Sequence, residues 1–99
     1  MVNHIVCWNF KEELSKEERI VAGNTIKEKL EAIKDCVSGA VSIKVKINQM
    51  ESSTKDIALI SCFESVEALN AYQVSPEHVE AAKYIKSVVC DRVCFDYEE

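Results

Sequence analysis

Two stretches of this sequence, residues 2–10 and residues 56–64, carry apolar side chains at both odd and even positions. A β-strand that is apolar on both faces is typical of the interior of a sheet that is covered on both sides. Residues 41–47 differ, because valine and isoleucine, starting with an inward-facing Val41, alternate strictly with serine and lysine. That alternation predicts an edge strand whose lysines point into solvent. The sequence therefore predicts central first and third strands, with the second strand at an edge.

A long helix is predicted between the first two strands. Ser15 and Glu18 form a capping box, in which the side chain of each residue bonds the backbone N–H of the other. Apolar residues then recur at steps of three and four as far as Val37, which predicts one buried helix face, and Gly39 is expected to end the segment. Gly23 lies inside this helix, where glycine costs about 1 kcal/mol relative to alanine, so we expect a packing reason for it.

The second half of the chain predicts a split helix and a last strand. Ser65 is expected to cap a short helix that reaches about Tyr72. Ser75 and Pro76 occupy the N-cap and first helical position of a second helix. Residues 88–97 then read as the closing strand. The predicted order is β-α-β-β-α-β, with the second helix split.

This order indicates the α+β class and a ferredoxin-like domain spanning residues 1–99. Two right-handed crossovers and a hairpin arrange the four antiparallel strands in the order 4-1-3-2. The helices can cover only one face of such a sheet. The other face would expose an apolar patch, consisting of Ile5, Cys7, Ala58, Ile60 and Cys62. Packing against a second copy would cover it, so we predict a homodimer.

Composition excludes several classes of function. The net charge is −5, and no basic stripe offsets it, so we expect no nucleic-acid partner. No apolar run approaches the roughly 18–20 residues of a membrane span, and the amino end lacks the pattern of a secretion signal, so we expect no membrane partner and a cytoplasmic location. The five cysteines show no Cys-x-x-Cys pair, and Cys90 with Cys94 falls short of a zinc site. No phosphate loop, esterase elbow or metal triad is present, so we predict neither a metal nor a cofactor.

Four blocks of the sequence resemble one known family: residues 2–6, residues 63–72 (Phe-Glu-Ser-Val-Glu-Ala-Leu-Asn-Ala-Tyr), residues 75–78 (Ser-Pro-Glu-His), and residues 91–93 with 95–97. Together they are similar to the stress-responsive dimeric α/β-barrel domain family. The resemblance implies a dimer whose two sheets form a barrel. The best understood relatives are plant polyketide cyclases, which close a linear poly-β-ketone by an intramolecular aldol step.

The resemblance also implies a site. Tyr72 and His78 match the catalytic pair of those cyclases, and His4 matches a histidine that lines their pocket. Two positions depart from the cyclase pattern, because Ile57 stands where the cyclase has a further histidine and Gly23 where it has a bulky aromatic residue. These departures predict a differently shaped pocket. The residues expected to contact a ligand are His4, Trp8, Ile57 and Leu59.

The chemistry of the pair follows from the two side chains. His78 lies at the third position of its helix, on a stripe that faces the sheet, and the positive helix terminus favours a neutral ring. A neutral imidazole can take a proton from a carbon next to a carbonyl, while the Tyr72 hydroxyl donates to the carbonyl or enolate oxygen. Alternatively, His78 tethers the preceding loop and Tyr72 is a core tyrosine with its hydroxyl at the rim. Asp91 and Arg92 are expected to form an ion pair or to anchor the dimer.

Three functions remain open at this point. The leading hypothesis is a homodimer that binds a small, largely apolar, carbonyl-bearing molecule and performs lyase-like or cyclase-like proton transfer. The second is a non-catalytic binding or structural module of stress physiology, whose helix–sheet space would be filled, so that a cavity of at least about 300 Å³ would count against it. The third is a cofactor-free monooxygenase, which has the same fold and no distinguishing residue.

Overall fold

Four strands form one antiparallel sheet in the computed structural model, which describes residues 1–99. The strands are β1 (Val2–Phe10), β2 (Ala40–Lys46), β3 (Ile57–Phe63) and β4 (Val89–Glu98). The helices are α1 (Lys16–Ala32), the single 3₁₀ turn η1 (Ile33–Asp35), α2 (Val66–Val74) and α3 (Pro76–Val88). The strand order is β2-β3-β1-β4, which is the predicted order read from the opposite edge. The predicted ferredoxin-like α+β fold is thus confirmed.

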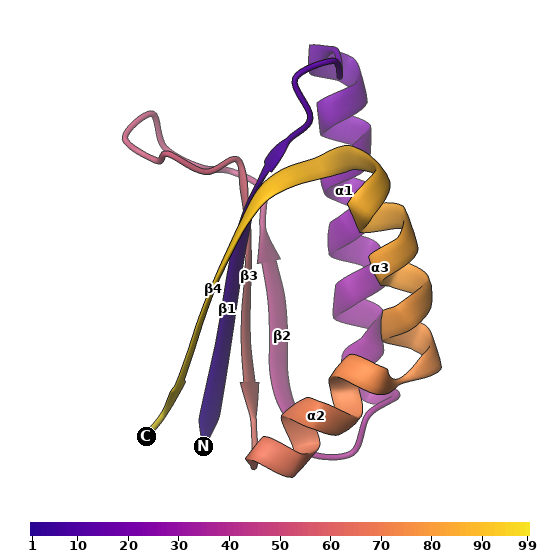
Figure 1. The fold of residues 1–99 in the computed structure, drawn as a ribbon, viewed down its shortest axis with the longest axis vertical. Helices are drawn as coiled ribbons and strands as arrows, with labels where there is room; N and C mark the ends of the chain where they lie inside the picture. Colours follow the sequence, from indigo (N-terminus) through magenta and orange to yellow (C-terminus); the bar gives the residue numbers. More distant parts are fainter.

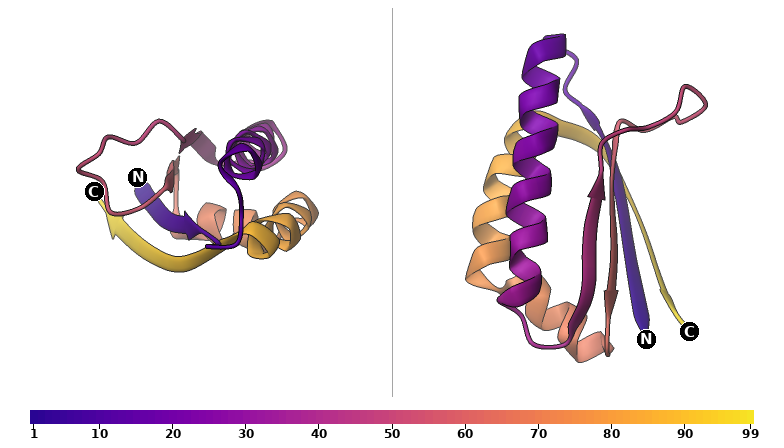
Figure 2. Two further views of the ribbon diagram at one scale, coloured as in Figure 1. Left: turned by 90° about the horizontal axis from the view of Figure 1, so that it is seen from above. Right: turned by 180° about the vertical axis from the view of Figure 1, so that it is seen from behind.

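The helices cover one face of the sheet, and the core lies between the two layers (Figures 1 and 2). Val6 and Trp8 of β1, Leu59 and Phe63 of β3 and Ile26 of α1 are among its buried members. The connection between β2 and β3 reaches away from the helices. None of the helices has both the length and the apolar character that crossing a bilayer requires.

Serine caps set the start of each α-helix. The Ser15 and Glu18 side chains form the predicted capping box at the start of α1. Ser65 accepts a hydrogen bond from the backbone of Ala68 at the start of α2. Ser75 caps α3, with Pro76 at its first position, as predicted. Ser75 also ends α2, so this one residue caps both helices and its extended backbone joins them.

Two local predictions were wrong. The α-helix was expected to continue to Val37, but it ends at Ala32 and tightens into η1, where the N–H of Cys36 bonds the carbonyl of Ile33. Such 3₁₀ turns are common at helix ends, and Val37 still packs against the core. Val41 was expected to face inward but is 40% exposed. The register of β2 against β3 shifts between Ala40 and Ser42, so Val41 is the extra residue of a bulge.

The two glycines differ in how strictly the structure requires them. A Cβ atom on Gly23 would lie 3.4 Å from side-chain atoms of Phe10 and Ile47, close to ordinary van der Waals contact, so the packing reason expected for this glycine is not found. Gly39 has a φ of +88°, a backbone conformation that L-residues with side chains rarely adopt. A Cβ atom there would also lie 2.6 Å from the Cβ of Ala68, so Gly39 is required both by its backbone and by its neighbour.

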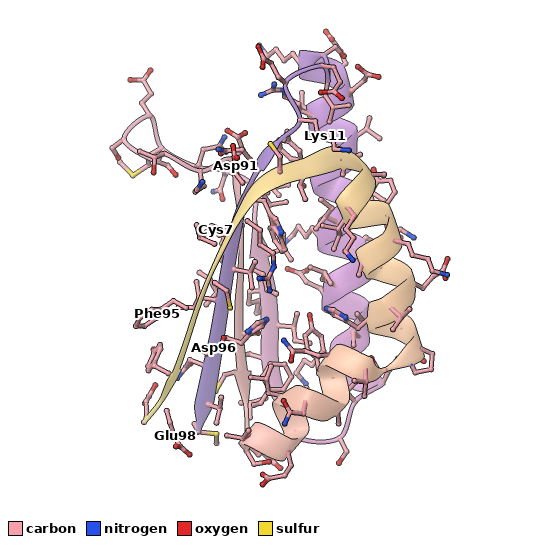
Figure 3. All side chains as sticks on the ribbon, viewed as in Figure 1. Cys7, Lys11, Asp91, Phe95, Asp96 and Glu98 are labelled. Carbon is pink, nitrogen blue, oxygen red and sulfur yellow. The ribbon has the colours of Figure 1, made fainter.

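The face of the sheet away from the helices is apolar and uncovered. The predicted patch residues Ile5, Cys7, Ala58, Ile60 and Cys62 are all half-buried or exposed. Strand β4 adds three exposed residues beyond the predicted patch: Val93, Phe95 and Tyr97. Ile5 is paired with Ile60 on one side and with Phe95 on the other, so the patch is continuous across three strands. Figure 3 shows Cys7 and Phe95 on this side, away from the helices.

Candidate active site

A pocket of about 700 Å³ lies between the sheet and α3, next to the uncovered edge strand β4. Its apolar wall includes Val6, Trp8, Leu30, Leu59, Ile85 and Val89. The polar side chains of His4, Tyr72 and His78 line the same space. An apolar pocket with a few convergent polar groups is the usual form of a small-molecule site.

Tyr72 lies in the last turns of α2 and has no exposed surface. Its hydroxyl is a buried polar group without any hydrogen-bond partner. A buried hydroxyl is normally bonded, because leaving it unpaired costs roughly 1–3 kcal/mol. Burial raises the pKa of Tyr72 to about 12. Tyr72 is therefore a neutral donor at ordinary pH, and its hydroxyl has no acceptor within the protein.

The ring of His78 contacts the ring of Tyr72 edge to face, with 4.6 Å between ring centres. Ser75 brings the two residues together: its Oγ accepts from the His78 backbone N–H at 3.2 Å and donates to the Tyr72 carbonyl at 2.7 Å. The pKa of His78 is lowered from its usual 6.5. Burial is the largest cause, the charges of His4 and Arg92 add to it, and the backbone of Gln73 opposes it. The neutral ring predicted from the helix terminus is thus favoured chiefly by burial.

His4 is the third polar group of the pocket and is held by a residue that sequence reasoning missed. Its Nδ1 atom lies 2.5 Å from a carboxylate oxygen of Asp96, which is its cross-strand partner on β4. His4 is buried, whereas the Asp96 side chain is 45% exposed. A carboxylate on Nδ1 selects the ring tautomer with its proton there. The other ring nitrogen, Nε2, then remains free to accept a proton or a hydrogen bond.

One group of side chains has the donor types of a metal site. The Sγ atom of Cys94 lies 3.9 Å from Nδ1 of His4 and 3.5 Å from Oδ1 of Asp96, and the three donor atoms lie within 4.8 Å of one another. Cys94 and Asp96 are two residues apart on β4, so both point to the face that His4 occupies. The hydrogen bond between His4 and Asp96 already satisfies Nδ1.

The structure brings together five of the six predicted site residues: His4, Trp8, Leu59, Tyr72 and His78 line the pocket. Ile57 does not line it and instead is buried opposite Trp8 in the β1–β3 register. Gly23 is also absent from its wall, because it packs against Phe10 and Ile47. Ile57 and Gly23, the two positions that depart from the cyclase pattern, therefore both lie outside the pocket wall of this chain.

Asp91 and Arg92 do not form the expected ion pair. Both residues line the pocket instead. Asp91 has a positive φ of 54° at the start of β4, and its carboxylate accepts a hydrogen bond from Asn9. Only the strand pairing of β1 with β4, which joins opposite ends of the chain, places Arg92 and Asp96 at this site.

Comparisons with known proteins agree with this fold. The model of the family described as Stress responsive A/B Barrel Domain matches residues 2–99. No curated protein sequence matches the chain significantly. A dimeric protein of unknown function and ferredoxin-like fold from Bacteroides fragilis is 35% identical, with a TM-score of 0.91, covering 99% of this chain and 95% of that one.

Two further solved structures carry the names of enzymes. A hydroxynitrile lyase from Passiflora edulis is 22% identical, with a TM-score of 0.76, covering 97% of this chain and 90% of that one. A proposed antibiotic biosynthesis monooxygenase from Nitrosomonas europaea is 11% identical, with a TM-score of 0.77, covering 100% of this chain and 98% of that one. At these identities the likeness establishes a shared fold and nothing about chemistry.

Proposed function

The chain belongs to the stress responsive A/B barrel domain family, and we propose that it binds a small, largely apolar, carbonyl-bearing molecule between helices and sheet and transfers a proton on it without a cofactor. The observation that carries this proposal is the buried, unpartnered hydroxyl of Tyr72, a residue that lines the pocket together with His4 and His78. A carbonyl oxygen is an acceptor that would satisfy that hydroxyl. The apolar wall suits the rest of such a molecule.

The proposed step is the removal of a proton from the carbon next to the carbonyl. The neutral ring of His78 takes the proton, and the electron pair of the broken C–H bond moves through the carbon framework to the carbonyl oxygen. The Tyr72 hydroxyl donates a hydrogen bond to the enolate oxygen that forms, and this bond strengthens as the oxygen gains charge. Return of the proton from His78 to a carbon of the product restores the starting ring, so no electrons or outside reactants are needed.

The geometry of the pair supports this division of roles. The carbonyl oxygen and the reacting carbon are both attached to the carbonyl carbon, and the Tyr72 and His78 rings are only 4.6 Å apart. His4, whose ring centre is 6.3 Å from that of Tyr72, has a free Nε2 on a ring held by Asp96. It is placed to share the enolate charge or to return the proton. His4 and Tyr72 are buried and His78 is half-buried, which strengthens the electrostatic interactions among the three groups.

The alternative of a non-catalytic structural module has less support. It requires side chains to fill the space between helices and sheet, and a pocket of about 700 Å³ well exceeds the roughly 300 Å³ at which small-molecule sites begin. A non-catalytic binding protein would use the same pocket and differs only in the absence of turnover. No residue of the pocket specifically favours the monooxygenase alternative.

We also propose that two copies pair through the uncovered face of the sheet. Ile60, Val93, Phe95 and Tyr97 on this face are between 40% and 65% exposed. A continuous apolar patch of this kind is typical of an interface, and the Bacteroides fragilis relative is described as dimeric. The cytoplasmic location stays a proposal, supported by five cysteines that form no disulfide.

Proton transfer can be tested before any natural substrate is known. Methyl ketones of increasing chain length are incubated with the protein in heavy water, and exchange of hydrogen for deuterium beside the carbonyl is followed by proton NMR. We expect Tyr72→Phe and His78→Ala each to slow the protein-dependent exchange roughly 100-fold. Tyr84→Phe is the matched control, because Tyr84 is half-buried on α3 outside the pocket. If ketones bind but the double variant exchanges them as fast as the wild type, catalysis by this pair is refuted.

A further inference from the structure

The pocket mouth is cationic in a protein whose net charge is −5. Three basic side chains line the pocket, namely Lys83 and Lys86 from α3 and Arg92 from β4. Only one carboxylate, that of Asp91, lines it with them. That carboxylate already accepts a hydrogen bond from Asn9 at 3.3 Å. Lysine and arginine therefore outnumber acidic groups here, in contrast to the chain as a whole.

Arg92 is the most informative of the three because its guanidinium has no carboxylate partner anywhere in the protein. Lys86 is likewise unpaired, and Lys83 approaches Glu80 only at 4.0 Å, with both side chains largely exposed. The charge of Arg92 acts on His78 inside the same pocket, so the two side chains face a common space. A guanidinium presents a planar fork of donors that matches a carboxylate.

The guanidinium of Arg92 lies on the same side of the pocket as the histidines. Its backbone is four residues from Asp96, about 13 Å of extended chain, but its side chain acts on the Cys94 thiol, whose Sγ lies 3.9 Å from Nδ1 of His4. An apolar wall with Val6, Trp8 and Val89 lines the same space. The pocket thus offers a donor for a carbonyl and an unpaired cation beside one apolar wall.

From this arrangement we propose that the ligand is an oxo acid, whose carboxylate is bound by Arg92 with Lys83 and Lys86 while its carbonyl lies at Tyr72. This inference rests on the proposed function, since it concerns the same pocket. It narrows the substrate class from carbonyl compounds in general to acids that carry both a ketone carbonyl and a carboxylate. It also assigns Arg92 a role in binding rather than in dimer contacts.

The test compares an acid with its own ester. The ligands are straight-chain oxo acids of roughly five to nine carbons with a terminal acetyl group, each compared with its own methyl ester, a range that fits the pocket. Binding of each is measured by NMR titration at low and moderate salt. We expect the acid to bind roughly 10-fold more tightly than the ester. A contact between arginine and a carboxylate is weak when fully exposed and strong when buried, and the contact at Arg92 would be partly exposed. Added salt should narrow this difference.

Two charge variants separate recognition from general attraction. Arg92→Gln should remove most of the preference for the acid and leave the binding of the ester unchanged. Lys34→Gln is the matched control, because it removes one charge from an exposed position outside the pocket and should preserve the preference. Equal binding of acid and ester by the wild type, or an unchanged preference in Arg92→Gln, would overturn the role of Arg92 while leaving the carbonyl pocket intact. If neither ligand binds, the proposed function and this inference both fail.

Discussion

Replacing Tyr72 by phenylalanine should stabilise the unliganded protein, which is the reverse of what most core substitutions do. The hydroxyl is buried without a partner, so folding removes it from water and returns no hydrogen bond. Such a group costs roughly 1–3 kcal/mol. The aromatic contacts of the ring, including the one with Phe63 at 5.0 Å between centres, are retained by phenylalanine. We expect the free energy of unfolding to rise by about 1 kcal/mol, equivalent to roughly 4–8 °C in Tm for a domain of this size.

The assay is urea-induced unfolding, followed by the fluorescence of Trp8, which is the only tryptophan and is buried. Several protein concentrations are needed, because a dimer would make the apparent stability depend on concentration. Tyr84→Phe provides the control for loss of a hydroxyl outside the pocket and should change stability by less than about 0.5 kcal/mol. A Tyr72→Phe protein that is less stable than the wild type by 1 kcal/mol or more, a loss typical of an ordinary hydrogen bond, would refute the reasoning, because the hydroxyl would then have a structural partner.

The same substitution has a second signature at alkaline pH. The pKa of Tyr72 is raised to about 12 from the ordinary value of 10.0, so the unfolded chain loses this proton before the folded protein does. The stability that this group contributes is present below pH 10 and is lost as the pH rises toward 12. Over that interval the wild type should lose about 1.4 kcal/mol per pH unit more than Tyr72→Phe does. Parallel stability curves for the two proteins would show that the phenol is not buried in solution.

Four further predictions concern other parts of the molecule. NMR titration of His78 should give a pKa below 6.5, so that the stability it contributes above pH 6.5 is lost as the pH falls through the folded-state value; His78→Gln should lack this loss. Asp96→Asn should slow ketone proton exchange at least roughly 10-fold and lower the free energy of unfolding in urea by only about 1 kcal/mol. The ring of His4 would stay where it is, but without the carboxylate its Nδ1 would no longer be held in the protonated tautomer. Phe95→Glu should weaken a dimer by roughly 3–6 kcal/mol, since the side chain is lost from both copies, and light scattering should then detect monomers at micromolar concentration. Gly39→Ala should destabilise the fold by roughly 2–4 kcal/mol through its positive φ and the contact with Ala68, and near-normal stability would show that this loop can rearrange.

The sequence predicted the fold well because the fold depends on local signals. Two strands that are apolar on both faces are expected to be central, and a strand with lysines on alternate positions is expected at an edge. Together with the hairpin between the second and third strands and the right-handed crossovers, these signals give the observed strand order. The caps at Ser15, Ser65 and Ser75 are also local, since each bonds a residue three positions ahead. The errors at Val37 and Val41 have a common cause. Periodicity assumes ideal geometry, whereas a 3₁₀ turn has fewer residues per turn than an α-helix and a β-bulge inserts one extra residue into a strand.

The site could be predicted only in part, because its parts lie far apart in the chain. Tyr72 and His78 are six residues apart, and their resemblance to a known motif made them visible. Asp96 contacts a residue 92 positions away, and its identity as a partner for His4 depends on the exact register of β1 against β4. A register shift near Cys7 and Asn9 makes that pairing impossible to count from the sequence. For the same reason, Arg92 was expected in an ion pair with Asp91 or at the dimer contact rather than in the pocket.

The open edge of the sheet explains why this site can exist in so small a domain. The helices pack over β1, β2 and β3, and the contacts between α3 and β4 are few beyond Val89, where one runs into the other. Cys94 and Asp96 are consequently exposed, although they point to the same face as the buried His4. Strand β4 therefore supplies polar side chains to the pocket without the cost of burying them fully. The other face of β4 presents Val93, Phe95 and Tyr97, which belong to the proposed dimer contact. A ligand bound on one face and a second copy bound on the other would therefore both contact this one strand.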